Sequence, residues 1–164
     1  MATALKNLSD YNPNEIPSAK GMRIGIAVAE WNTHITGALL DGTLNTLKKQ
    51  GALDSDIIVK PIPGSYELPT AAQFFFESSL ELDAVICIGC LIKGETVHFE
   101  YICEAISQGI KDVSLKYNKP VIFGVLTVLT EQQALDRCGG KHGNKGDEAA
   151  VTAIKMIALQ KSLS

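Results

Sequence analysis

The stretch Ile24-Gly25-Ile26-Ala27-Val28-Ala29 decides the fold. It is a short, continuous apolar run without alternation, as expected for a parallel strand that is covered on both faces. Apolar residues then recur at helical spacing, at Ile35, Leu39, Leu40, Leu44 and Leu47. Asn32 or Thr33 is available as the N-cap of this helix, and Gly51 stands just past its end. The opening segment is therefore a strand followed by a helix.

The same unit repeats along the chain. Further strands are predicted to start at Ile57-Ile58-Val59 and to span Ala84–Leu91 and Val121–Leu126, and further helices to span Leu68–Leu80, about Phe99–Tyr117, Glu131–Arg137 and Ala149–Leu163. Strict alternation of strand and helix implies right-handed crossovers and a parallel sheet covered on both faces. The sequence therefore predicts an α/β fold, a three-layer α/β/α sandwich around a four-stranded parallel sheet.

The first twenty residues have a different character. They lack periodicity and contain the turn-forming stretch Tyr11-Asn12-Pro13-Asn14-Glu15-Ile16-Pro17. We therefore expect residues 1–20 to form an N-terminal arm outside the core and residues 21–164 to form one domain. A chain of 164 residues with 46% hydrophobic content is long enough for one buried core.

Charge and cysteine usage narrow the class of protein. The 15 basic and 18 acidic residues are interspersed and give a net charge of -3, so no charged block favours a nucleic acid or membrane partner. Without a signal segment or a long apolar run, we expect a cytoplasmic protein with reduced thiols. Cys87 and Cys90 fall in one predicted strand, where a spacing of three turns them to opposite faces. We interpret them as buried residues rather than as a redox or metal pair.

Ligands of such sheets bind beyond the carboxyl ends of the strands. We therefore expect the ligand site among the four loops that follow the strands: Glu30–Thr33, Pro63–Glu67, Ile92–His98 and Thr127–Thr130.

The loop after the third strand has the features of an anion site. It enters a helix, so free backbone N–H groups and the positive end of the helix dipole converge on it. Gly94 allows close approach of a ligand and Thr96 adds a hydroxyl, whereas the carboxylate of Glu95 would repel a phosphate unless it points outward. We infer that only the backbone of Glu95 faces the ligand. The alternative is that Thr96 merely caps the helix.

His98 lies in the first turn of the helix that follows this loop. The helix dipole disfavours imidazolium there, which suits a neutral ring acting as a general base. An ordinary surface role is the alternative, as for His34 and His142, and the three histidines show no metal-ligand spacing.

Aromatic and charged residues in the other loops leave open alternatives. Trp31, the one tryptophan, could stack on a planar ligand or close the edge of the core. Glu67 could cap a helix or bind ligand hydroxyls. Arg137, Lys141 and Lys145 lie among glycines in a basic segment that we expect to be flexible. This segment could wrap a phosphate or remain solvated.

Several stretches resemble the lumazine synthase family, roughly from Arg23 to Ala158. The motifs are Gly89-Cys90-Leu91-Ile92-Lys93-Gly94-Glu95-Thr96-Val97-His98-Phe99, Gly143-Asn144-Lys145-Gly146, Ala29-Glu30-Trp31-Asn32, Pro63-Gly64-Ser65-Tyr66-Glu67-Leu68-Pro69, Pro120-Val121-Ile122-Phe123-Gly124-Val125-Leu126-Thr127 and Glu131-Gln132-Gln133-Ala134-Leu135-Asp136-Arg137. They occur in the order of the family and near its spacing.

The resemblance implies condensation of 5-amino-6-ribitylaminopyrimidinedione with 3,4-dihydroxy-2-butanone 4-phosphate, without metal or organic cofactor. It also implies a role for each matching residue. Trp31 stacks on the pyrimidine, and Asn32, Ser65 and Glu67 hold the ribityl chain. Tyr66 also binds the substrate, at a position where phenylalanine or tryptophan is common. The backbone of Cys90, Leu91 and Ile92 meets the polar edge of the ring. Glu95, Thr96 and Arg137 hold the phosphate, His98 transfers protons, Lys145 lies near the substrates, and Phe123 reaches into the site of a neighbouring subunit.

The resemblance further implies a homo-oligomer. Each site is completed between adjacent subunits of a pentamer, and the N-terminal arm joins a neighbouring sheet. Some family members pack twelve pentamers into a hollow icosahedral shell, and the short segment from Cys138 to Gly146 is as in these relatives. Riboflavin synthase is a candidate partner. Lys93 stands where arginine is common, so any contact made there is expected to be looser.

Two other classes share this general architecture. One is a binding module, either a flavodoxin-like electron carrier or a receiver domain. A receiver would carry an aspartate where Cys90 and Leu91 stand, and a flavin carrier would bind flavin tightly. The other class is a purely structural shell protein, which would show no turnover.

Overall fold

The computed structural model describes residue 7 and residues 9–163. The strands and helices are β1 (Ile24–Ala29), α1 (Thr33–Lys49), β2 (Ile57–Ile62), α2 (Leu68–Glu77), β3 (Ala84–Ile92), α3 (His98–Tyr117), β4 (Val121–Val128), α4 (Glu131–Leu135), β5 (Cys138–Gly140), β6 (Gly143–Asn144) and α5 (Lys145–Ser162). Short 3-10 turns occupy Pro13–Glu15, Asp54–Asp56 and Ser65–Glu67.

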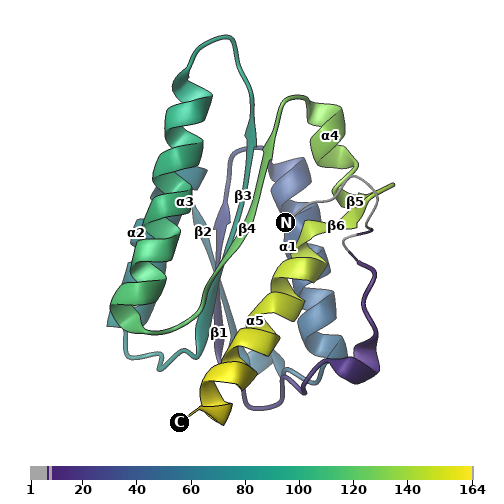
Figure 1. The fold of residues 1–164 in the computed structure, drawn as a ribbon, viewed down its shortest axis with the longest axis vertical. Helices are drawn as coiled ribbons and strands as arrows, with labels where there is room; N and C mark the ends of the chain where they lie inside the picture. The colour runs from purple at the N-terminus through teal and green to yellow at the C-terminus, as the bar shows by residue number, and fades with distance from the viewer. Residues whose placement is uncertain (1–6, 8, 164) are drawn as a thin grey trace.

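The main sheet has the strand order β2-β1-β3-β4, and all its pairings are parallel. Ile26 of β1 stands opposite Val59 of β2 and Ile86 of β3, and Cys87 pairs in register with Phe123 of β4. Helices α1 and α5 lie on one side of the sheet, and α2 and α3 lie on the other (Figure 1). The predicted four-stranded α/β/α sandwich is confirmed.

The sheet divides the core into two apolar layers because successive residues of a strand face opposite sides. Even-numbered residues of β3, such as Ile86 and Ile88, pack with α1 and α5, whereas Val85 and Cys87 pack with α2 and α3. Cys90 faces the α1 and α5 layer, so the prediction that Cys87 and Cys90 are buried on opposite faces is confirmed. Fully burying one such aliphatic side chain contributes about 1.5–3 kcal/mol.

The last helix begins four residues earlier than expected. Asn144 accepts a hydrogen bond from Gly146 N at 2.8 Å and so caps α5, which starts at Lys145 rather than Ala149. Gly146 allows α5 to pack closely on α1, because a Cβ built there would lie 1.9 Å from Leu39 O of α1. Two other helices end earlier than predicted: α2 ends at Glu77 rather than Leu80, and α4 ends at Leu135 rather than Arg137.

The glycine-rich segment before α5 is also different from expectation. It folds into a two-stranded antiparallel hairpin, β5–β6, rather than staying flexible. Within the hairpin, Asn144 Nδ2 donates to Cys138 O at 3.3 Å, and it also reaches Ala38 O of α1 at 2.9 Å. These bonds fix the hairpin against the domain.

The N-terminal segment packs against the domain in part. Ile16 and Ala19 are buried in the α1 and α5 layer, and Ser9 Oγ accepts a hydrogen bond from Asn144 N at 2.8 Å. The expectation that the first twenty residues stay outside the core is therefore wrong for Ile16 and Ala19, because these two apolar side chains pack in the core layer of α1. Residues 1–6 and 8 lie outside the described residues, and joining a neighbouring sheet stays a prediction.

A search of the helices in the described part of the chain finds none with the length and apolar character to cross a membrane.

Candidate active site

The carboxyl ends of the four parallel strands lie at one end of the sheet, where Figure 1 shows the β3–α3 connection and α4. Contacts join the loop after β1 to the loop after β2 and to the end of β3, and Lys93 N at the start of the loop after β3 donates to Val128 O at the end of β4. The side chains that meet there define a candidate site.

Trp31 and Glu67 flank the same glycine. A Cβ built on Gly64 would lie 3.1 Å from Glu67 Oε2 and 3.4 Å from Trp31 Cδ1. Trp31 is 73% exposed, so its ring does not close the edge of the core, and that alternative is wrong. Glu67 makes no side-chain cap to α2. An exposed aromatic face thus lies beside a carboxylate, which suits a planar ligand carrying hydroxyl groups.

Asn32 connects the end of β1 to the end of β3. Its backbone is left-handed, with φ 59° and ψ 48°, a conformation that asparagine tolerates better than most residues. The side chain does not cap α1; Nδ2 instead donates to Cys90 O at 3.2 Å. Asn32 therefore fixes the position of Trp31 relative to the end of β3.

Ser65 presents a buried hydroxyl. The residue is 5% exposed, and among the described residues Oγ has no hydrogen-bond partner. It lies against Gly89 of β3, where an added Cβ would approach Oγ to 2.5 Å. A buried polar group without a partner is uncommon and is a reason to look for a ligand. Tyr66, the next residue, is exposed.

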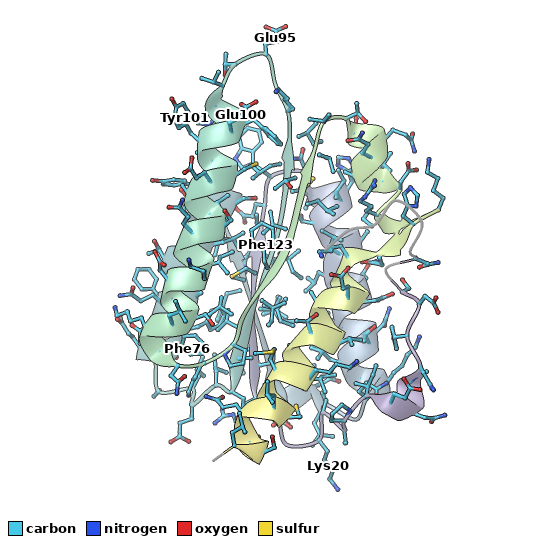
Figure 2. All side chains as sticks on the ribbon, in the orientation of Figure 1. Lys20, Phe76, Glu95, Glu100, Tyr101 and Phe123 are labelled. Carbon is cyan, nitrogen blue, oxygen red and sulfur yellow. The ribbon has the colours of Figure 1, made fainter. Side chains whose placement is uncertain are left out.

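The β3–α3 loop, Lys93–Val97, is exposed throughout. Glu95 stands at its tip and points away from the body of the domain in Figure 2, as expected if only its backbone faces a ligand. Thr96 Oγ1 accepts from His98 N at 3.4 Å, a long bond that supports the capping alternative in part. His98 is exposed and opens α3, as predicted.

The ends of the β3–α3 loop are joined by a contact that the sequence did not suggest. Lys93 Nζ lies 2.6 Å from Glu100 Oε1, and this hydrogen bond lowers the pKa of the Glu100 carboxyl. A lysine and a glutamate seven residues apart, across a turn, follow no helical spacing rule that would have predicted the pair.

The three cations of the basic segment differ in their partners. Lys141 Nζ lies 3.0 Å from Asp136 Oδ2, and Lys145 Nζ lies 2.7 Å from Glu148 Oε1. Arg137 Nη1 donates to Gln133 O at 3.0 Å, and within the described residues no carboxylate pairs with its guanidinium. Arg137 is thus the cation of the three whose charge is not already offset by an ion pair.

Arg137 and the β3–α3 loop belong to different sides of the sheet. The segment that carries Arg137 packs through Ala134 and Cys138 on the α1 and α5 layer, whereas α3 packs on the other layer. In Figure 1 α3 and α4 stand on either side of β4. Within one chain, the predicted phosphate ligands Thr96 and Arg137 therefore belong to segments on opposite sides of the sheet.

Phe123 lies in the middle of the edge strand β4, well below Glu95 in Figure 2. It is half-buried on the α2 and α3 side and borders a surface hollow with Ile110 and Lys111 of α3. It is not part of the group around Trp31. Leu91 and Ile92, by contrast, end β3 beside the site and are half-buried.

Cys90 also lies at this end of β3, but its thiol is not a nucleophile. Burial raises its pKa to about 12, so the thiolate is scarce at neutral pH. Among the described residues no group of three or more His, Cys, Asp or Glu side chains could hold a metal ion.

Comparison with known proteins assigns this arrangement to a family. The sequence model described as 6,7-dimethyl-8-ribityllumazine synthase matches residues 21–161. The chain belongs to the lumazine synthase family. It is 55% identical to the 6,7-dimethyl-8-ribityllumazine synthase of Parabacteroides distasonis, an alignment that covers 96% of this chain and 98% of the relative. The protein of the same name from Porphyromonas gingivalis is 52% identical, with 98% of this chain and 99% of the relative covered.

Membership in the lumazine synthase family makes the chain an enzyme of riboflavin biosynthesis and excludes the receiver and electron-carrier alternatives. The contacts of the Gly143-Asn144-Lys145-Gly146 motif show a structural role. Asn144 and Gly146 seat α5 on α1, and the ammonium of Lys145 pairs with Glu148.

Proposed function

We propose that the chain condenses 5-amino-6-ribitylaminopyrimidinedione with 3,4-dihydroxy-2-butanone 4-phosphate to give 6,7-dimethyl-8-ribityllumazine, phosphate and water. The observation that carries this proposal is the group at the end of the sheet: the exposed ring of Trp31, the carboxylate of Glu67 beside it and the buried hydroxyl of Ser65. The family match names the reaction, and this group offers the contacts that a flat, hydroxylated substrate requires.

In this proposal the pyrimidine stacks on Trp31, and its polar edge meets the backbone of Cys90, Leu91 and Ile92. Ser65 and Glu67 bind hydroxyls of the ribityl chain. Asn32 holds the strand ends in register through Cys90 O and offers its remaining amide capacity to the same chain. Tyr66 covers the outer side of the site, where its exposed ring can close over a bound substrate.

The phosphate of the butanone substrate binds at the β3–α3 loop. Backbone N–H groups at Glu95 and the hydroxyl of Thr96 donate to it, and the N-terminus of α3 favours the negative charge. Arg137 adds a guanidinium from a neighbouring subunit. The support for sharing the site is that the segment carrying Arg137 packs on the opposite layer of its own chain, and that no carboxylate of the described residues pairs with Arg137.

His98 moves protons beside this phosphate. The 5-amino group of the pyrimidine attacks the ketone, and a first water leaves to form a Schiff base. Phosphate is then eliminated and the resulting enol becomes a ketone, which the ribitylamino nitrogen attacks to close the ring with loss of a second water. Each step transfers a proton to or from carbon, nitrogen or oxygen, and the exposed imidazole at the start of α3 is placed beside the loop that receives the substrate. Lys145, held by Glu148, contributes positive charge near the substrates.

A shared site requires an oligomer, and a pentamer is the proposed unit. Phe123 on the edge strand β4 would then reach into the adjacent site, and the N-terminal residues would join a neighbouring sheet. Assembly of pentamers into a shell, association with riboflavin synthase and a cytoplasmic location stay predictions.

The decisive experiment is to mix both substrates with purified protein and to follow the fluorescence of the lumazine. We expect product with the wild-type protein and a rate lower by about 10²-fold or less for His98→Ala, the usual range for one acid–base group. His142→Ala, on the turn between β5 and β6, is the matched control and should retain the rate. Absence of product would leave a structural shell protein as the better reading, and an unchanged rate for His98→Ala would remove His98 from the mechanism.

A further inference from the structure

The pair formed by Lys93 and Glu100 spans the whole β3–α3 loop. Lys93 is anchored at its backbone, where its N–H donates to Val128 O of β4 at 2.9 Å. Glu100 belongs to the first turn of α3. With Nζ and Oε1 2.6 Å apart, the side chains join the sheet to the helix across the loop.

The loop between these two residues has weak support of its own. A Cβ built on Gly94 would meet nothing within 4 Å, and residues 94–97 are exposed. The other hydrogen bonds that hold the loop to the helix are long, with Thr96 Oγ1 3.4 Å from His98 N and Val97 O 3.4 Å from Tyr101 N. The Lys93–Glu100 ion pair is therefore the shortest contact that holds the loop in shape.

Electrostatics gives the pair a second consequence. A carboxylate one helical turn from a bound phosphate repels it unless a cation offsets its charge. Glu100 lies in that position, and Lys93 offsets it. The ammonium of Lys93 is thus directed to Glu100, and its charge is not free for a direct contact with substrate.

We infer that Lys93 and Glu100 are positioning residues that act as one unit: their ion pair sets the shape of the β3–α3 loop for the phosphate, and Lys93 is not a phosphate ligand. This inference rests on the proposed function, because it assigns the loop to the phosphate of the butanone substrate. Arginine is common in the family at the position of Lys93. Lysine can form the same ion pair, because binding one carboxylate oxygen does not require the two-pronged guanidinium of arginine.

The test is a double-mutant cycle with Lys93→Met, Glu100→Ala and the double variant. The pair is about half exposed, so each single change should raise KM for the phosphate substrate by about two- to fivefold. KM for the pyrimidine and kcat should stay within about twofold of wild type, and the double variant should be no worse than either single one. Lys93→Arg keeps the pair and should behave as wild type.

Lys48→Met is the matched control. Lys48 Nζ lies 2.6 Å from Asp54 Oδ1, the same separation, at the opposite end of α1 from the site. Lys48→Met should leave both KM values unchanged. An effect of Lys93→Met would then be specific to the Lys93–Glu100 pair and would not follow from the loss of any surface ion pair.

Titration of each variant with inorganic phosphate, followed by ³¹P NMR, gives a readout that does not depend on turnover. We expect weaker phosphate binding in both single variants. The inference is overturned if Lys93→Met alone weakens binding while Glu100→Ala leaves it equal or tighter, because the ion pair then does not set the shape of the loop. Additive effects, or no effect in either variant, overturn it as well. If the wild-type protein makes no lumazine, the proposed function fails, and the phosphate titrations still decide the inference.

Discussion

Replacing Ser65 with alanine should make the protein more stable and less active. The hydroxyl is buried, and among the described residues it has no hydrogen-bond partner, so folding removes it from water without a replacement. Such burial costs about 1–3 kcal/mol. Ser65→Ala deletes one oxygen and leaves little empty space, so the free energy of unfolding should rise by about 1 kcal/mol, or about 2–4 °C in Tm for a chain of this size.

The activity should change in the opposite direction. If the hydroxyl binds the ribityl chain, its loss removes one hydrogen bond and raises KM for the pyrimidine by about 2- to 10-fold. The assays are urea unfolding followed by circular dichroism at one protein concentration, because an oligomer's stability depends on concentration, and initial rates at varied pyrimidine.

Thr43→Val is the matched control for Ser65→Ala. Thr43 Oγ1 is also buried, but it lies 2.9 Å from Leu39 O and 3.1 Å from Gly146 O. Removing this satisfied hydroxyl should destabilise the protein by about 1 kcal/mol and leave KM unchanged. The reasoning is refuted if Ser65→Ala destabilises the protein as Thr43→Val does, or if KM for the pyrimidine does not move.

Three further predictions follow from the geometry. Arg137→Leu should raise KM for the phosphate substrate by about 10-fold or more, the value of a charged hydrogen bond, and should change KM for the pyrimidine far less; equal effects on both would remove Arg137 from the phosphate pocket. Asn144→Ala should lower the free energy of unfolding by about 2 kcal/mol, because it removes the cap of α5 and the hydrogen bond to Ala38 O. Asn45 in α1 is exposed, and Asn45→Ala should change this free energy by no more than about 0.5 kcal/mol in the same urea titration. Burial raises the pKa of the Cys90 thiol from 9.0 to about 12. As pH rises, the unfolded chain therefore loses this proton before the folded chain does. The free energy of unfolding should then fall between about pH 9 and pH 12. Unfolding measured at both ends of this range should show a shallower decline for Cys90→Ala, and an unchanged slope would contradict the assignment.

Local pattern was sufficient for most of the fold. The apolar run Ile24–Ala29 and the helical spacing after it reproduce β1 and α1, because both faces of a central strand and one face of a helix must be apolar to be buried. The glycine-rich segment before α5 was misjudged. Glycines predict flexibility locally, but the segment folds into the β5–β6 hairpin, which Asn144 ties to Ala38 O of α1, more than a hundred residues away in the chain.

The site was predictable to a similar extent. Trp31, Glu67 and the β3–α3 loop were expected because loops at the carboxyl ends of parallel strands gather in one place. The contact of Asn32 with Cys90 O and the pair of Lys93 with Glu100 were not predicted, since the approach of the groups in each depends on how β3 meets its neighbours.

The sequence by itself determined the order of strands and helices, the two apolar layers and the family, because these follow from residue type and spacing along one segment. Only the tertiary structure decided which polar groups have partners: that the hydroxyl of Ser65 has none among the described residues, and that Lys141 and Lys145 are already paired. It also decided that the segment carrying Arg137 packs on the layer opposite α3. The reason is physical, since a hydrogen bond or ion pair depends on distances of a few ångströms between segments that are remote in the chain.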